Sequence, residues 1–338
     1  MTTELTDSAP TALIDRFGRR ITYLRISVTD RCDFRCAYCM GSDQRFAPRD
    51  QLLSLKEIAQ VARTFVSLGV RKVRLTGGEP LVRRNVLWLI REIASLPGLD
   101  ELVITTNGSR LAELAEQVRA AGVRRINISL DSLRPERFRR ITRKGDLAAV
   151  LRGIDAALAA DFERIKLNAV ILKHRNHDES PDLVRFAVDK GINISFIEEM
   201  PVGQIGEHNR AEVFYSSDCI RSDLRSRFQL VPTTETTGGP ARYYRIPGTE
   251  TRVGFISPHS HNFCGDCNRV RVTAQGRLLP CLGQEQVLDL RHILREHPGD
   301  ETELSRVIQD AMQHKPRGHE FGRREDFALV RHMNVTGG

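Results

Sequence analysis

Three cysteines near the start of the chain have the spacing of ligands to a metal cluster. Cys32, Cys36 and Cys39, here called the N-terminal triple, form a Cys-x3-Cys-x2-Cys pattern directly after a strand-like stretch. Three thiolates on one loop can hold three corners of a cubane four-iron cluster and leave the fourth iron open to a substrate or cofactor. Zinc sites favour paired Cys-x2-Cys spacing. The pattern therefore favours a cluster over a zinc knuckle with a distant fourth ligand, or over three ordinary thiols.

A second group, Cys264, Cys267 and Cys281, has the spacing Cys-x2-Cys-x13-Cys and is here called the C-terminal triple. Spacing alone fits zinc, with His259 or His261 as fourth ligand, as well as it fits iron–sulfur chemistry. With the N-terminal triple in the same chain, a second cluster with an open iron is the better hypothesis.

Two arginines follow the second group. Arg269 and Arg271 lie two residues apart, so an extended backbone would point both side chains the same way. Guanidinium groups there suit phosphate oxygens, which they can bind bidentately, although surface charge is the simpler alternative. Cys219, the seventh cysteine, stands alone, and we expect it to be a plain buried thiol.

Composition limits the classes of protein that the chain can be. Its 338 residues suggest about two domains, or one large barrel with an appendage. Hydrophobic residues make up 40%, and scattered basic residues give a net charge of +8. No apolar run could span a membrane, and no secretory or transit signal is expected at the start. Aromatic residues are only 6%, without a basic stripe, which disfavours nucleic-acid binding. The cysteines are clustered and odd in number, and neither a membrane span nor a signal is expected. Together these features predict a cytoplasmic protein.

The positions of strand-like and helix-like stretches predict the fold. They alternate about six times in the first two thirds of the chain, which indicates a parallel α/β sheet, open or barrel-like, with chemistry at the carboxyl ends of the strands. The expected strands are Leu24–Thr29, Val73–Thr76, Leu102–Thr106, Arg125–Leu130, Ile165–Ile171 and Ile194–Glu198. The expected helices are Leu55–Leu68, with a capping box at Ser54 and Glu57, Asn85–Leu96, Arg110–Ala121, Asp146–Ala160 and Asp178–Lys190.

The alternation breaks after about Met200. We expect a loop at Thr233–Pro240, short β pairs over Ala241–Ser257, and a mostly helical stretch from about Val287 to Met312. A basic tail then closes on Gly337 and Gly338.

The N-terminal triple, with an aromatic residue before its last cysteine, resembles the radical S-adenosylmethionine (SAM) superfamily. In that superfamily the open iron binds SAM, and an electron from the cluster cleaves it to a 5′-deoxyadenosyl radical. The Thr76–Pro80 element, Thr-Gly-Gly-Glu-Pro, follows a strand and is similar to the SAM-contacting motif of the superfamily. Alone, it would be an ordinary turn with proline. The resemblance implies an α/β fold, a partial parallel (β/α)6 radical SAM barrel with a C-terminal α+β cluster-binding region.

Over nearly the whole chain, the joint pattern resembles the molybdenum cofactor biosynthesis protein A family of GTP 3′,8-cyclases. The resemblance rests on both triples and on Leu13–Arg19, Leu24–Cys32, Phe196–Met200, Asn262–Cys264 and Gly337-Gly338. It implies two 4Fe-4S clusters, SAM as cofactor, and a lyase that converts GTP to (8S)-3′,8-cyclo-7,8-dihydroguanosine 5′-triphosphate. We expect an N-terminal extension over 1–20, the barrel over 21–230, and the second cluster and tail over 231–338.

The resemblance also implies roles for individual residues. SAM contacts would be Tyr38, Gly78, Glu79, Ser129 and Met200. GTP contacts would be Arg25, Lys72, Arg74, Thr105, Lys166, Arg269 and Arg271. Arg269, Arg271, Gly337 and Gly338 would take part in catalysis. The expected partners are a reductant protein such as flavodoxin or ferredoxin and the next pathway enzyme, cyclic pyranopterin monophosphate synthase. The resemblance permits a homodimer.

One departure from the family concerns the nucleotide. Ser195 stands where the family commonly has an arginine, so either another cation substitutes or the chain is a paralogue with different binding. The alternative function is a radical SAM enzyme with an auxiliary cluster that acts on a different nucleotide or a peptide. A zinc-stabilised nucleic-acid-binding module is the alternative from another class.

Overall fold

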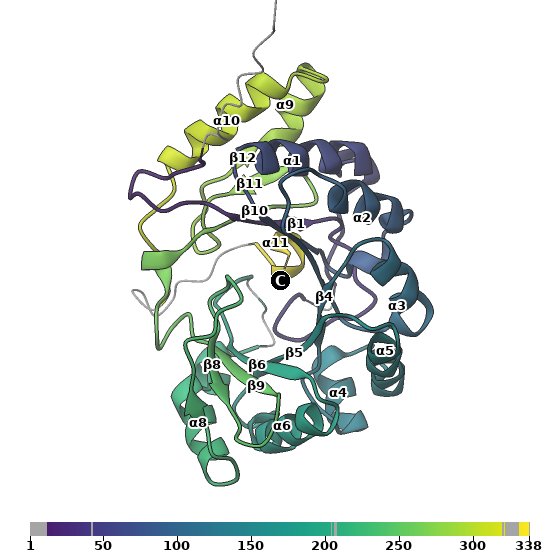
Figure 1. Cartoon of the computed structure of the whole chain (residues 1–338), viewed down its shortest axis with the longest axis vertical. Coiled ribbons are helices and arrows are strands. Elements are labelled where there is room, and N and C mark those ends of the chain that lie inside the picture. The colour runs from purple at the N-terminus through teal and green to yellow at the C-terminus, as the bar shows by residue number, and fades with distance from the viewer. Residues whose placement is uncertain are drawn as a thin grey trace, which may run out of the picture.

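The computed structural model describes residues 12–41, 43–203, 205, 208–319, 321 and 331–337. Within them, one sheet of twelve strands curves around the C-terminal segment (Figure 1). The alternation of strands and helices confirms the α/β barrel expected from the sequence. The six strands of the barrel pair in parallel in chain order: β1 (Tyr23–Ser27), β2 (Lys72–Thr76), β3 (Glu101–Thr106), β4 (Arg125–Ser129), β5 (Arg164–Ile171) and β6 (Asn193–Glu198).

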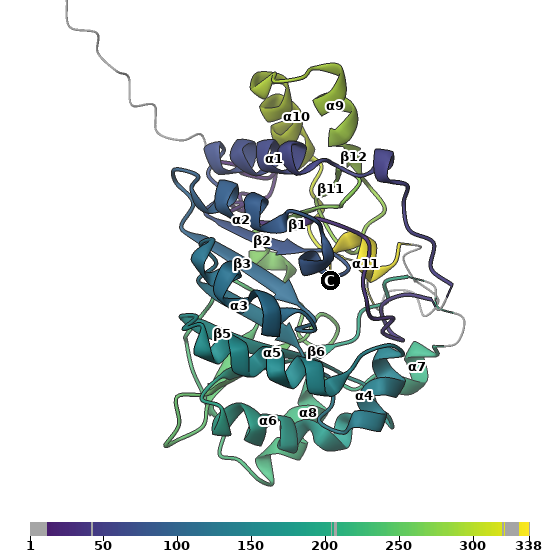
Figure 2. The same ribbon diagram turned by 90° about the vertical axis from the view of Figure 1, so that its right-hand side faces the viewer.

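Helices cover the outer face of this sheet (Figure 2). They are α1 (Leu55–Ser67), α2 (Val86–Ala94), α3 (Leu111–Ala120), α4 (Pro135–Thr142), α5 (Leu147–Ala159) and α6 (Ser180–Asp189). The capping box at the start of α1 is confirmed, because the Ser54 side chain accepts from the Glu57 amide and the Glu57 side chain accepts from the Ser54 amide. The structure adds α4, which sequence analysis did not predict. The sequence of α4 is polar and rich in arginine, and it shows little helical periodicity.

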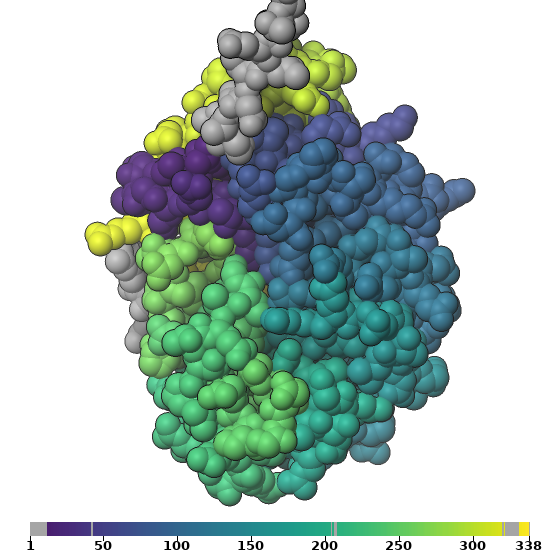
Figure 3. All heavy atoms as spheres, in the orientation of Figure 1, coloured from purple at the N-terminus to yellow at the C-terminus, as the bar shows by residue number. Residues whose placement is uncertain are grey.

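The C-terminal region extends the barrel sheet at both edges. At one edge β10 (Arg269–Val272) pairs in parallel with β1, followed by antiparallel β11 (Arg277–Leu279) and β12 (Leu288–Asp289). At the other edge β9 (Arg252–Ile256) pairs in parallel with β6, followed by antiparallel β8 (Arg242–Arg245) and β7 (Val231–Pro232). Figure 3 shows green C-terminal residues lying against both the purple and the teal parts of the barrel.

The remaining helices lie in the C-terminal third, apart from two short ones that follow the barrel. They are α7 (Arg210–Val213), α8 (Ser217–Arg225), α9 (Leu290–Glu296), α10 (Glu301–Gln313) and α11 (Met333–Thr336). Helices α9 and α10 confirm the helical stretch expected before residue 312. Helix α11 lies inside the curve of the sheet, near its centre in Figure 1.

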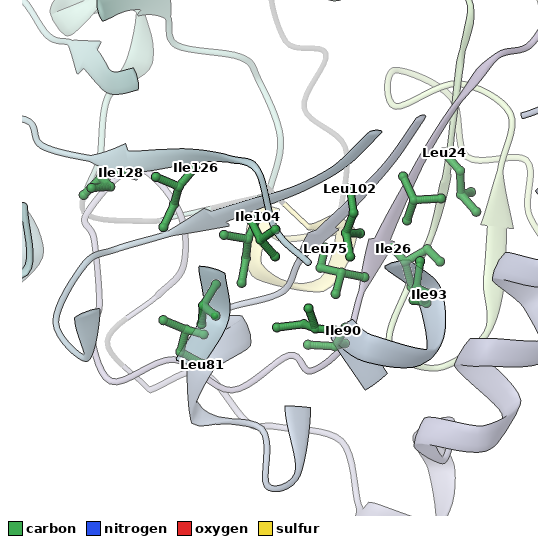
Figure 4. Packing of buried hydrophobic residues seen from close by; sticks show 14 of the residues in the cluster. Leu24, Ile26, Leu75, Leu81, Ile90, Ile93, Leu102, Ile104, Ile126 and Ile128 are labelled. Atoms are coloured by element: carbon green, nitrogen blue, oxygen red, sulfur yellow. The ribbon is translucent and has the colours of Figure 1, made fainter. Parts of the chain in front are cut away.

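The main core lies between the barrel strands and the outer helices. Ile26, Leu75 and Ile104 of β1, β2 and β3 are fully buried, and they face Ile90 and Ile93 of α2 (Figure 4). Because these strands are covered on the helix side by apolar residues, their other face is free to carry the polar residues that point into the barrel.

One expectation about the thiols is wrong. Cys219 is exposed rather than buried. It lies in the first turn of α8, whose buried side consists of Ser217, Ile220 and Leu224, and Cys219 falls outside that stripe. The expected domain boundaries at 20/21 and 230/231 stay a prediction. No helix among the described residues has the length and apolar character needed to cross a bilayer.

Candidate functional site

One cavity inside the barrel is lined by all six cysteines of the two triples. The N-terminal triple lies on the loop after β1, and the loop after β2 packs directly on it. Glycine is required for this approach, since a Cβ on Gly77 would lie 2.6 Å from the Thr29 carbonyl oxygen and one on Gly78 would lie 2.8 Å from that of Asp30. The Gly78 amide donates to Thr29 O at 2.7 Å, which joins the two loops.

The thiols of the N-terminal triple suit a metal cluster. Burial raises the pKa of all three thiols, and the charges of Cys39 and Cys32 add to the rise at Cys36. The Phe34 amide donates to Cys32 Sγ at 3.4 Å, an interaction that favours the thiolate. Metal ligation requires that thiolate form, so several buried thiols on one loop fit a positively charged cluster better than they fit free cysteines.

The residues expected to contact SAM surround this loop. Gly78, Ser129 and Met200 line the cavity. Tyr38 also lines it, and its hydroxyl donates to Asp131 Oδ2 at 2.7 Å. Burial raises the pKa of Asp131 to about 6, against the hydrogen bond from Tyr38 that lowers it. Asp131 therefore fixes the orientation of the Tyr38 ring.

Glu79 lies behind the cavity instead of in its lining. Its carboxylate accepts from the Leu81 amide at 3.0 Å, from Thr106 Oγ1 at 2.7 Å and from the Asn107 amide at 2.6 Å. Burial raises its pKa to about 7, although the hydrogen bonds from Asn107, Leu81 and Thr106 lower it. Through these hydrogen bonds, Glu79 joins the loop after β2 to the loop after β3.

The C-terminal triple lines the same cavity, from the turn after β9 and the segment after β11. Buried Lys315 supports it: Nζ donates to Pro280 O at 2.6 Å and Arg269 O at 2.9 Å, and lies 3.7 Å from Cys267 Sγ. Burial raises the pKa of Cys267, but the charges of Lys315 and Arg269 outweigh it and lower the pKa overall. A stabilised thiolate is what a metal ligand needs.

Pairing of β10 with β1 brings four basic or polar side chains into register. Tyr23 pairs with Arg269, and Arg25 pairs with Arg271. All four line the cavity. Burial and the neighbouring Arg271 hold the pKa of Arg25 well below its usual range, and burial and Arg269 lower the pKa of Arg271 to about 10. An anion would relieve such mutual repulsion, so this register of buried guanidinium groups favours anion binding.

Further cations come from β2 and β5. Lys72, Arg74 and Lys166 line the same cavity, as does Thr105, which accepts from Arg74 Nη1 at 2.7 Å. Burial lowers the pKa of both lysines. All of the residues expected to contact GTP are therefore brought together in one place.

Three residues that hydrogen-bond to these cations were missed by sequence reasoning: Tyr23 and Thr237 line the cavity, and Tyr243 lies beside it in a smaller adjoining pocket. Tyr23 accepts a hydrogen bond from Arg74 Nε, and burial alone would raise its pKa, but the charges of Arg74, Arg25, Lys72 and Arg269 lower it to about 7. Thr237 O accepts from Lys72 Nζ at 2.8 Å, and the Tyr243 hydroxyl accepts from Lys166 Nζ at 3.3 Å. Nothing in their local sequence distinguishes them.

Ser195, the position of the departure, is fully buried on β6 opposite Gly254 of β9. A Cβ on Gly254 would lie 2.6 Å from Ser195 Oγ and 2.8 Å from the Tyr243 ring, so these two side chains already fill the space. The small serine is the residue that this packing accommodates.

The segment at 331–337 runs from the N-terminal triple to the arginines. The Met333 amide donates to Cys39 O at 3.2 Å, and Asn334 Nδ2 donates to Asp30 O at 3.0 Å. Gly337 O then accepts from Arg271 Nη1 at 2.7 Å and from Arg25 Nη2 at 3.1 Å. The structure thus brings Gly337 to the cationic site, while Gly338 lies outside the described residues.

Comparison with known proteins shows the family of the chain. Residues 26–187 match the radical SAM superfamily, and residues 192–321 match the family Molybdenum Cofactor Synthesis C. The chain is 58% identical to the GTP 3′,8-cyclase of Ectopseudomonas mendocina (strain ymp), over 96% of this chain and 98% of that one. It is 60% identical to the GTP 3′,8-cyclase of Pseudomonas entomophila (strain L48), over 97% and 99%.

The chain belongs to the GTP 3′,8-cyclase family. Members of this family are radical SAM enzymes, which use an iron–sulfur cluster and SAM, so the superfamily and family expected from the cysteine patterns are confirmed. Streptococcus suis SuiB bound to S-adenosylmethionine superimposes with a TM-score of 0.60 at 13% identity, over 86% of this chain and 69% of that one, which supports the fold.

Proposed function

We propose that this protein is a lyase that converts GTP to (8S)-3′,8-cyclo-7,8-dihydroguanosine 5′-triphosphate in the first step of molybdenum cofactor biosynthesis. The observation that carries the proposal is that a single cavity joins both cysteine triples to a buried set of cations. A site that holds SAM at one end and a nucleotide triphosphate at the other needs this combination.

Each triple would hold one 4Fe-4S cluster, with one iron left open. The N-terminal triple would hold the cluster whose electron cleaves SAM, and the C-terminal triple would hold a cluster that offers an iron to guanine. Tyr38, Gly78, Ser129 and Met200 would contact SAM. Glu79 would hold the loops that form this half of the cavity.

The buried cations would bind the triphosphate of GTP. A triphosphate carries about four negative charges, and each charge-assisted hydrogen bond to it contributes about 1.5–3 kcal/mol. Arg25, Lys72, Arg74 and Lys166 would act with Arg269 and Arg271, and Thr105 would orient Arg74. Lys72 is already paired with Glu101 at 2.5 Å, but the arginines Arg25 and Arg271 repel one another, and phosphate binding would remove that repulsion.

Arg269, Arg271 and the Gly-Gly end would position the reacting atoms. Gly337 O accepts hydrogen bonds from the guanidinium groups of Arg25 and Arg271, so a movement of the C-terminal segment would also move these two side chains. We assign to Gly337 and Gly338 the task of holding the GTP ribose where a hydrogen atom can be removed from C3′, after which C3′ bonds to C8 of guanine.

The proposal includes partners and a location. A low-potential protein such as flavodoxin or ferredoxin would supply electrons, and cyclic pyranopterin monophosphate synthase would take the product. The cytoplasm is the compartment in which seven unpaired thiols stay reduced. A homodimer is compatible with the proposal.

The test is anaerobic incubation of the purified, iron-reconstituted protein with SAM, dithionite and GTP. We expect a brown protein with about eight irons per chain, and formation of 5′-deoxyadenosine together with a cyclised nucleotide. Stoichiometric zinc without iron would refute the cluster assignment. Formation of 5′-deoxyadenosine without a GTP product would favour an enzyme that acts on a different nucleotide or a peptide.

A further inference from the structure

A shallow groove lies on the outside of the barrel, away from the cavity. It is lined by the start of α1, the 3-10 helix Pro80–Val82, α2 and the start of α3. Helices α1, α2 and α3 follow one another down one side of the molecule in Figure 2. We call it the basic groove, and its charged lining residues are Lys56, Arg83, Arg84, Arg91 and Arg110.

The lining carries only positive charge among the described residues. Arg110 is paired with Glu113 at 3.2 Å, and Arg83 donates to the Leu53 carbonyl at 2.8 Å. Lys56, Arg84 and Arg91 are exposed, and within the described part of the chain their side chains make no hydrogen bond or ion pair. These three charges are available to an external anionic partner.

An aromatic anchor lies among the cations. Trp88 is the single tryptophan of the sequence, and its side chain is 37% exposed beside half-buried Leu55, Leu87 and Leu114. A partly exposed tryptophan with arginines around an apolar floor has the composition of a protein-binding hot spot. Trp88 lies outside the buried core, so its packing in the core does not explain its presence here.

The groove adjoins the loop that carries the N-terminal triple. Asn107 Nδ2 lies 3.8 Å from Cys32 Sγ and donates to Asp33 Oδ1 at 2.6 Å, while Ser109 Oγ donates to Asp33 Oδ2 at 2.6 Å on the exposed surface. The next residue, Arg110, donates to the Leu81 carbonyl inside the groove at 3.1 Å. Only a few side chains therefore separate the groove from Cys32.

We propose that the basic groove docks an acidic electron-carrier protein, which reduces the cluster held by the N-terminal triple. The inference rests on the proposed function, because only a cluster that cleaves SAM needs this electron. The carrier's reduced flavin or iron–sulfur centre loses one electron and the cluster gains it, with no bond formed and no proton moved. Complementary charge steers the encounter, and Trp88 provides the short-range contact.

The experiment uses the full-length, cluster-loaded protein and a reduced bacterial flavodoxin of strongly negative net charge. Arg84→Glu/Arg91→Glu and Trp88→Ala are compared with wild type. The matched control is Arg152→Glu/Arg185→Glu, two exposed arginines on α5 and α6 whose side chains make no hydrogen bond or ion pair within the described part of the chain. We measure the flavodoxin dissociation constant at low and high salt, and 5′-deoxyadenosine formation with flavodoxin and with dithionite.

We expect the double charge reversal to weaken flavodoxin binding by about tenfold or more and to remove most of its salt dependence. Trp88→Ala should weaken binding while the salt dependence persists. Dithionite is small and needs no docking, so dithionite-driven turnover should be equal in all variants. Unchanged affinity in the groove variants, or an equal loss in the control, would overturn the proposal. If wild type fails with dithionite, the proposed function fails, whereas the binding measurement still decides the docking surface.

Discussion

Replacing Gly337 with alanine should separate SAM cleavage from formation of the cyclised nucleotide. Gly337 has φ +74°, and a Cβ there would overlap Thr76 Oγ1 and lie 3.3 Å from the Ser27 Cβ. An L-residue in this conformation costs about 1–2 kcal/mol before any overlap is counted. The end of the chain can relieve both problems by moving out of the cavity.

That movement would break the two hydrogen bonds that Gly337 O accepts from Arg25 and Arg271. Each charge-assisted bond contributes about 1.5–3 kcal/mol, so about 3–6 kcal/mol of positioning is lost. A loss of 3 kcal/mol in the reacting arrangement corresponds to a decrease of about a hundredfold in the rate. We therefore expect cyclised nucleotide to fall by at least about a hundredfold, with iron content unchanged.

The assay quantifies 5′-deoxyadenosine and cyclised nucleotide side by side. Gly248→Ala is the control for backbone strain, since Gly248 has φ +78° and no atom within 4 Å of an added Cβ. It should lower the free energy of unfolding by about 1–2 kcal/mol and leave the product ratio unchanged. Adding Thr76→Ala to Gly337→Ala removes the overlapping hydroxyl and should restore part of the product. Full product from Gly337→Ala, or no recovery in the double variant, would refute the reasoning.

Four further predictions concern the two halves of the cavity. Replacing the N-terminal triple with alanine should halve the iron and abolish 5′-deoxyadenosine, whereas replacing the C-terminal triple should halve the iron and abolish only the cyclised product. Arg269→Ala and Arg271→Ala should each weaken GTP binding by about one to two decades, measured by calorimetry, and unchanged binding in both would remove their assigned role. Ser195→Arg should lower the free energy of unfolding by about 1–3 kcal/mol without tightening GTP binding, because neighbouring side chains already fill the space around Ser195; tighter GTP binding would contradict this packing argument. Lys315→Met should leave the carbonyls of Pro280 and Arg269 without a donor, costing about 1–3 kcal/mol each, and should lower the iron retained by the C-terminal triple; wild-type iron content would count against this support.

Much of the barrel could be predicted from the sequence, because the spacing of apolar residues along a helix or strand indicates which of its faces is buried. The expected strand Arg125–Leu130 became β4 (Arg125–Ser129), and the expected helix Leu55–Leu68 became α1 (Leu55–Ser67) with its capping box. Helices α4 and α8 were missed, since their polar sequences bury only a narrow stripe. Because α8 was not predicted, the sequence did not indicate that Cys219 lies on its solvent-facing side.

The residue types and spacings by themselves determined the chemistry: two triples of thiols, glycines where two loops meet, and two alternating arginines. Tertiary structure decided where that chemistry gathers. Parallel pairing of β10 with β1 places Arg269 and Arg271 beside Tyr23 and Arg25, which are more than two hundred residues away in the chain. Such register depends on long-range packing and leaves no local pattern in the sequence. The same is true of the approach of Gly337 to Arg25 and Arg271. The lowered pKa of Tyr23 arises in the same way, because it is the sum of charges from three strands that meet only in the folded protein.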